Sequence, residues 1–158
     1  MQRNIRILGT GKYLPARLVT SRALDQQLGL AAGTIERKAK IISRHFVAAE
    51  TAAQMAAAAA RAAVAAAGLT LKDIDCLVAA NATMDQGMPY NAALLHGELQ
   101  LDEFQTPAFD VGTSCLSFLT ALDVVSYQIA AGRYRRALIA SSDIASCGLD
   151  WGILESSA

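Results

Sequence analysis

The chain has 158 residues, and its 14 lysines and arginines balance its 14 aspartates and glutamates, so the formal net charge is zero. A chain of this length normally forms one domain, and balanced charge provides no basic field for nucleic acid or an anionic membrane surface. The sequence contains neither a signal-peptide pattern nor an apolar segment long enough to span a bilayer. We therefore expect a soluble cytoplasmic protein without nucleic-acid or membrane partners.

The N-terminal residues 4–8 read as a short strand, followed by the glycine pair Gly9 and Gly11. A dinucleotide-binding loop would need a third glycine where Leu14 stands and a helix where Pro15 interrupts it. We therefore reject that function. The glycines are interpreted as residues that allow a tight turn with positive φ.

Residues 21–29 predict a short amphipathic helix, with Ser21 as its N-cap and Gly29 at its end. From residue 31 to 48 the apolar pattern weakens and positive charge gathers. The basic residues there are Arg37, Lys38, Lys40 and Arg44. Two interpretations stay open: contact with an anionic carrier or a phosphate, or a solvated loop face.

The alanine-rich run Ala52 to Ala67 predicts the clearest helix, because alanine has the highest helix propensity. Thr51 and Gln54 have the spacing of a capping box, and Gly68 stands where a left-handed C-terminal residue belongs. A helix with so little side-chain bulk can pack very closely against a neighbour. We therefore expect it to be buried scaffold.

Two strand-like runs follow, separated by a loop and a helix. Cys76 to Ala80 is apolar without alternation, which is typical of a strand covered on both faces, so Cys76 is expected to be inert. The loop from Asn81 to Met88 leads to a helix from Pro89 to Leu99, with the proline at the first helical position. Residues 107–111 predict the next strand.

A strongly apolar helix is predicted from Ser114 to Ala131, ended by Gly132 and followed by a strand over 137–141. Its apolar residues surround the axis, so we expect it to be buried nearly all round. Alternating strands and helices with short connections indicate an α/β fold: a parallel or mixed sheet with helices on both faces. Active groups in such sheets lie at the carboxyl ends of the strands.

Cys115 falls at such an end, where the strand breaks at Gly112 and the helix begins. Amide groups at a helix N-terminus favour a thiolate and can also hold an oxyanion. A nucleophilic cysteine is therefore the leading hypothesis, and a small buried apolar residue is the alternative. The other cysteines, Cys76 and Cys147, form no CxxC pair with it, and the histidines stand alone, so the sequence predicts neither a metal site nor a cofactor.

Several motifs together resemble the β-ketoacyl-ACP synthase III family. They are Gly9-Thr10-Gly11-Lys12-Tyr13-Leu14-Pro15, the alanine-rich helix before Asp73-Ile74-Asp75, the Phe109–Phe118 run, and Ala140-Ser141-Ser142-Asp143. The resemblance implies the N-terminal half of a thiolase-like fold over 1–158, with a layered α/β architecture, a mixed but mostly parallel sheet and a buried central helix. It also implies that Cys115 is the catalytic nucleophile.

The family reaction implied by this resemblance begins with transfer of an acyl group from a thioester to the cysteine. A malonyl thioester then loses carbon dioxide, and the carbanion attacks the acyl-enzyme. Acyl-CoA or acyl-ACP and malonyl-ACP or malonyl-CoA are the implied partners. Three alternatives stay open: acyl transfer to an alcohol or amine, head-to-head joining of two acyl-CoAs, and a non-catalytic half that pairs with another chain.

The sequence departs from the family where it ends at Ala158, before the second half that carries the family's histidine and asparagine. Neither His45 nor His96 lies in the family's histidine motif. We therefore expect a chain that is incompetent for condensation alone and that exposes apolar surface. Artificial truncation, proteolysis and a split gene remain alternative origins of this end.

The resemblance also suggests binding residues. Thr34 and Ile42 replace the tryptophan and arginine that hold CoA, which favours a carrier protein as the donor or a specialised secondary-metabolic synthase. Lys38 and Arg44 remain candidates to bind a phosphopantetheine. Met88 corresponds to a pocket residue that crosses the interface of a homodimer, with a core gap-filler as its alternative. The small side chain of Ala145 would leave room in that pocket for a longer or branched acyl group.

Overall fold

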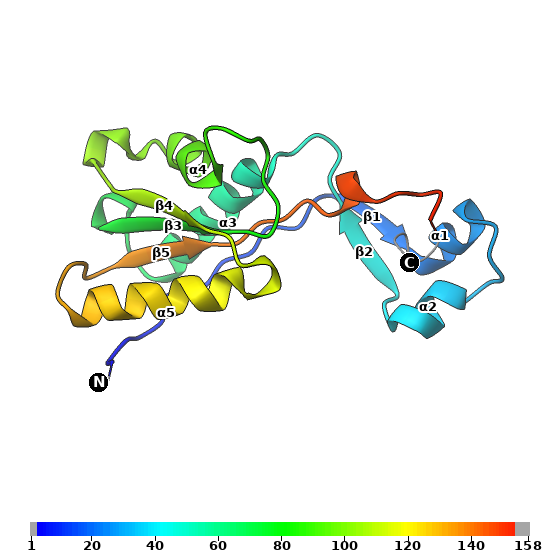
Figure 1. Ribbon diagram of the computed structural model, residues 1–158, viewed down its shortest axis with the longest axis horizontal. Helices are drawn as coiled ribbons and strands as arrows, with labels where there is room; N and C mark the ends of the chain where they lie inside the picture. Colours follow the sequence, from blue (N-terminus) through cyan, green and yellow to red (C-terminus); the bar gives the residue numbers. More distant parts are fainter. Residues whose placement is uncertain (1–2, 154–158) are drawn as a thin grey trace. The chain divides into compact units, whose positions relative to one another are not determined.

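The computed structural model describes residues 3–153, which divide into two compact units. Within the described residues, the first unit combines residues 3–13 with Thr51–Asp143, and the second combines Leu14–Glu50 with residues 144–153. The first contains a three-stranded parallel sheet and the second a two-stranded antiparallel sheet (Figure 1). Within the described residues, the helices are too short or too polar to cross a membrane.

The sheet of the first unit consists of β3 (Cys76–Ala80), β4 (Ala108–Val111) and β5 (Ala137–Ala140), in the order β4-β3-β5. The central strand β3 pairs in parallel with both neighbours. All five of its residues are buried, as the unbroken apolar run predicts. The α/β prediction is therefore confirmed.

Two helices, α3 (Ala52–Ala66) and α4 (Asn91–Leu99), cover one face of this sheet (Figure 1). Both share an apolar cluster with Leu77 of β3. The predicted capping box of α3 is present, because the Thr51 hydroxyl accepts the Gln54 N–H at 3.1 Å and the Gln54 side chain accepts the Thr51 N–H at 3.2 Å. Two reciprocal bonds thus satisfy amides that the helix start leaves unpaired.

The opposite face of the sheet is covered by α5 (Ser117–Ala130), whose Ala121 and Val125 pack against β3 (Figure 1). The other sides of this helix are more open: Phe118 is 45% exposed and Leu119 is 61% exposed. The prediction of a central helix buried nearly all round is therefore wrong for this chain. Apolar residues surround the helix axis, whereas the described sheet covers only one side.

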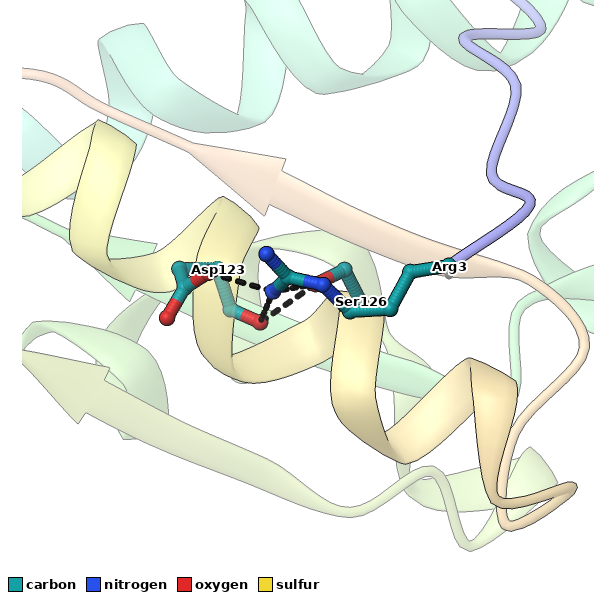
Figure 2. Close-up of polar contacts among 3 residues, drawn as sticks. All are labelled: Arg3, Asp123 and Ser126. Atoms are coloured by element: carbon teal, nitrogen blue, oxygen red, sulfur yellow. Dashed lines mark hydrogen bonds and ion pairs between the residues drawn. The ribbon is translucent and has the colours of Figure 1, made fainter. Parts of the chain in front are cut away.

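The N-terminal segment runs beside α3 and α5, but the strand predicted over residues 4–8 does not form in the described chain. Arg3 fastens this segment to α5 (Figure 2). Its guanidinium forms an ion pair with Asp123, donates to the Ser126 hydroxyl at 2.6 Å, and lies 4.1 Å from the centre of the Tyr127 ring. The segment is thus held by side chains and close packing, not by strand pairing.

Gly9 and Gly11 explain the close packing of this segment on α3. A Cβ atom on Gly9 would lie 2.4 Å from the carbonyl oxygen of Ala63, and one on Gly11 would lie 2.2 Å from that of Ala59. Neither glycine has the positive φ that the tight-turn interpretation requires, so that interpretation is wrong. The glycines are needed because the segment meets the helix backbone, and the small side chains of the helix permit the same approach.

The described part of the second unit contains β1 (Arg17–Thr20), α1 (Ser21–Gln27), α2 (Thr34–Ala39), β2 (Ser43–Phe46) and a 3₁₀ turn at Ser146–Gly148. The first helix was predicted one residue late, because Thr20, not Ser21, caps it by accepting the Ala23 N–H at 3.1 Å. Leu24, Ile35 and Phe46 form the core of this unit. The sequence did not predict α2 or either strand, since elements of four to six residues are too short to establish a period.

Candidate active site

Cys115 lies at the junction between β4 and α5, and its side chain is exposed. A short 3₁₀ turn over Ser114–Leu116 separates the strand from the α-helix, which begins at Ser117. The alternative of a small buried cysteine is therefore wrong. The thiol is accessible at the carboxyl end of a strand, where a nucleophile can meet its substrate.

The backbone of this turn has a left-handed residue directly before the cysteine. Ser114 has a φ of +53°, a region that residues other than glycine rarely adopt. The Leu116 N–H donates to the Thr113 carbonyl at 3.1 Å, and the Ser117 N–H donates to the Ser114 carbonyl. These two amides are engaged within the turn, so an oxyanion there would have to use other donors.

A buried hydroxyl, that of Ser117, contacts the turn and the neighbouring strand together. The side chain is 2% exposed, and its Oγ lies 2.9 Å from the Thr113 nitrogen, 2.7 Å from the Ser114 carbonyl oxygen and 3.0 Å from the Asn81 carbonyl oxygen. The sequence pattern did not predict a role for this residue. A serine at the start of an otherwise apolar helix was the available signal.

The carboxyl ends of the three parallel strands are joined by hydrogen bonds. Asn81, which follows β3, donates its backbone N–H to Val111 of β4 at 3.2 Å and its side-chain amide to the Ser142 carbonyl after β5. The Asp143 carboxylate accepts the N–H groups of Ala82 and Thr83 at 2.7 and 2.6 Å. The structure thereby brings together the Asn81 loop and the Cys115 turn, as their predicted places at strand ends imply.

The loop that contains Met88 has a well-bonded base and an exposed tip. The Asp85 carboxylate accepts the N–H groups of Ala52 and Ala53 at 2.8 and 2.9 Å, and the Asn91 side chain accepts the Asp85 N–H at 3.0 Å. Met88 itself is 86% exposed, so the alternative of a core gap-filler is wrong. The helix after the loop starts at Asn91, two residues later than the predicted start at Pro89.

The remaining predicted binding residues belong to the second unit. Lys38 is exposed in the last turn of α2, and Ala145 is exposed just before a 3₁₀ turn. Arg44, on β2, is partly buried and donates to the Ser21 hydroxyl at 3.4 Å. Their roles toward a substrate remain predictions. Ile42, between α2 and β2, is 71% exposed.

The two histidines make local contacts. A ring nitrogen of His45 lies 2.5 Å from the Pro15 carbonyl oxygen, and one of His96 lies 3.0 Å from that of Thr106. His96 also pairs with Asp102 at 3.4 Å. Among residues 3–153, no three histidine, cysteine or acidic side chains are grouped as metal ligands would be.

The first unit also has an apolar groove of about 360 Å³, bordered by the N-terminal segment, α3, α5 and β5. Ile7, which is 70% exposed, and Phe118 line it, whereas Cys115 and Met88 do not. Apolar surface is therefore exposed in this chain, as expected from the sequence.

Cys76 provides a test of stability against pH. It is 0% exposed on β3, and burial raises the pKa of its thiol above the ordinary value. The folded chain therefore keeps this proton at pH values where the unfolded chain releases it. Its contribution to stability is complete below the unfolded pKa and is lost as the pH rises through the folded pKa.

We expect the difference in unfolding free energy between the wild type and Cys76→Ala to stay constant below about pH 8 and to shrink above it. Urea unfolding under reducing conditions at several pH values measures this difference. The values at neutral pH are the internal control, because they contain the packing cost of the substitution alone. A difference that does not change up to about pH 10 would contradict the prediction.

Comparison with known proteins shows which family this chain resembles. The family model for 3-oxoacyl-[acyl-carrier-protein (ACP)] synthase III matches residues 109–157, which include Cys115. A curated beta-ketoacyl-[acyl-carrier-protein] synthase III from Acidiphilium cryptum is 36% identical over 152 residues, covering 96% of this chain and 47% of that protein. The chain spans about half the length of the curated relatives that it matches.

Solved structures agree with the sequence comparison. The crystal structure of 3-oxoacyl-[acyl-carrier-protein] synthase III from Aquifex aeolicus matches with a TM-score of 0.89 at 28% identity, over 95% of this chain and 48% of that one. The corresponding Pseudomonas aeruginosa structure matches with a TM-score of 0.85 at 29% identity, over 92% of this chain and 44% of that one. The fold is therefore thiolase-like, as the sequence resemblance implies.

Proposed function

We propose that this relative of the 3-oxoacyl-ACP synthase III family is an acyltransferase in which Cys115 receives an acyl group from acyl-CoA or acyl-ACP. The observation that carries the proposal is the exposed thiol at the junction between β4 and α5, inside the range that the family model matches. The Cys115 thiolate attacks the thioester carbonyl, a new thioester forms on the enzyme, and the CoA or carrier thiolate leaves. One thioester replaces another, so the exchange is nearly neutral in free energy.

For a chain of the full length of the relatives, the proposed second step is decarboxylative condensation with a malonyl thioester, as in fatty acid biosynthesis. The enolate formed by loss of carbon dioxide needs hydrogen-bond donors held in place. His45 and His96 already contact backbone carbonyls, so we assign them no part in this step. We expect residues 1–158 to act as the domain that carries the nucleophile, acylated alone but inactive in condensation.

The proposed partners follow from the charge and exposure of the binding residues. Lys38 and Arg44 are assigned to the phosphopantetheine of the donor, because cations bind its phosphate. Met88, exposed on its loop, and the edge strand β4 are assigned to a homodimer in which the methionine borders the partner's acyl pocket, with Ala145 as a further wall. A reducing cytoplasm suits the exposed thiols of Cys115 and Cys147.

The test is acylation of the folded chain. We would incubate it with a short acyl-CoA and, separately, with the same acyl group on a carrier protein, and then measure intact mass and map the modified peptide. We expect one acyl group on the peptide that contains Cys115. A chain that shows cooperative unfolding but takes no acyl group from either donor would refute the proposal, and the more effective donor would establish the donor class.

A further inference from the structure

We propose that Ser117 is a positioning residue that holds the Cys115 turn against the carboxyl end of β3. This inference rests on the proposed role of Cys115 as the acyl carrier. The observation behind it is that the buried Ser117 hydroxyl lies within hydrogen-bond distance of Thr113, Ser114 and Asn81. Two of these residues precede the cysteine in the same turn, and the third follows the central strand.

The donors and acceptors define what this hydroxyl does. A serine hydroxyl has one proton to donate and lone pairs that accept. Its oxygen accepts the Thr113 N–H at 2.9 Å, and its proton is shared between the carbonyl oxygens of Ser114 at 2.7 Å and Asn81 at 3.0 Å. With 2% exposure, water has little access to replace these bonds.

The Ser117 hydroxyl stabilises the backbone conformation of Ser114. Ser114 has a φ of +53°, a left-handed conformation that is unfavourable for a residue other than glycine and that its surroundings must stabilise. The Ser117 bond to the Ser114 carbonyl holds this residue from one side, and the bond from Thr113 holds the chain just before it. Cys115 follows directly, so the direction of its side chain depends on this local conformation.

Asn81, the third partner of the Ser117 hydroxyl, is held in place by hydrogen bonds of its own. Asn81 is bonded through its N–H to Val111 and through its side chain to Ser142, and its neighbours Ala82 and Thr83 bond to Asp143. The Ser117 hydroxyl therefore joins the cysteine turn to a frame that spans the ends of all three parallel strands. Without that hydroxyl, the Cys115 thiol stays at the junction between β4 and α5, but its orientation is no longer fixed.

The experiment compares a reaction that needs an oriented thiol with one that does not. Misplacing a reacting group by about 1 Å costs on the order of 100-fold, whereas iodoacetamide approaches from many directions. We expect Ser117→Ala to lower the rate of Cys115 acylation by about 10- to 100-fold and to change its alkylation by iodoacetamide by less than about 2-fold. Ser117→Thr, which keeps a hydroxyl, is expected to recover most of the acylation rate.

The matched control is Ser126→Ala, which removes another buried hydroxyl from α5, 3% exposed and bonded to the Asp123 carbonyl at 2.6 Å. It should acylate at the wild-type rate. If Ser117→Thr does not fold, hydrogen exchange of the Thr113 amide, expected to be faster in Ser117→Ala than in Ser126→Ala, replaces it as the second readout. Wild-type acylation in Ser117→Ala would overturn the positioning role, whereas a wild type that takes no acyl group would refute the proposed function itself.

Discussion

An alanine at position 115 is expected to abolish formation of the acyl-enzyme. The substitution removes the exposed thiol between β4 and α5, and neither remaining cysteine has the same surroundings. Cys76 is 0% exposed, and burial raises the pKa of its thiol, so it lacks both access and the ionised form. Cys147 is exposed, but it belongs to the second unit and lies in the 3₁₀ turn Ser146–Gly148, not at the junction between β4 and α5.

We expect the acylation rate of Cys115→Ala to fall by about 1,000-fold or more, since loss of a covalent nucleophile removes the intermediate itself. Intact mass after incubation with the acyl donor measures this change. Cys147→Ala is the matched control, because it removes the other exposed thiol and should keep the adduct. An acyl group that forms on Cys115→Ala at the wild-type rate would contradict the prediction.

Gly11→Ala is expected to lower the stability of the chain considerably, although it adds only one methyl group. Its Cβ would lie 2.2 Å from the Ala59 carbonyl oxygen and 2.4 Å from the Ala63 nitrogen. Both are backbone atoms of α3, so neither can rotate away as a side chain would. Overpacking of this kind costs about 1–3 kcal/mol, through movement of the helix or release of the N-terminal segment.

Gly97→Ala is the matched control for this substitution. Gly97 lies in α4, and a Cβ there meets no atom within 4 Å. The control should stabilise the chain by about 0.5–1 kcal/mol, because alanine loses less backbone entropy in a helix. Urea unfolding of both variants measures the two effects, and a Gly11→Ala chain as stable as the wild type would show that the segment does not pack on α3.

The long and strongly patterned elements could be predicted from sequence. The helix that begins after Thr51 follows from alanine propensity and a local capping box, and both of these depend only on neighbouring residues. The central strand β3 was also predictable, since five consecutive apolar residues indicate burial on both faces. Short elements of the second unit, such as α2, were not, because six residues make less than two helical turns.

The candidate site likewise contains one feature that could be predicted from sequence and one that could not. Cys115 could be identified because a strand, a glycine and a helix follow one another in the chain, and that order alone places the thiol at a strand end. The role of Ser117 does not follow from its place at the start of an apolar helix, because one of its three partners, Asn81, is 36 positions away in the chain. Only pairing of β3 with β4 brings that carbonyl to the turn.

The sequence by itself determined the order of the longer elements of the first unit, the α/β class, the burial of the central strand and the place of Cys115 at a strand end, because each depends on local propensity or on a short apolar pattern. Tertiary structure alone decided why Gly9 and Gly11 are needed, how far α5 is exposed and which hydroxyl holds the Cys115 turn. These features depend on which backbone atoms from distant segments come within contact distance. The packing of the first unit, and no local pattern of residues, determines these contacts.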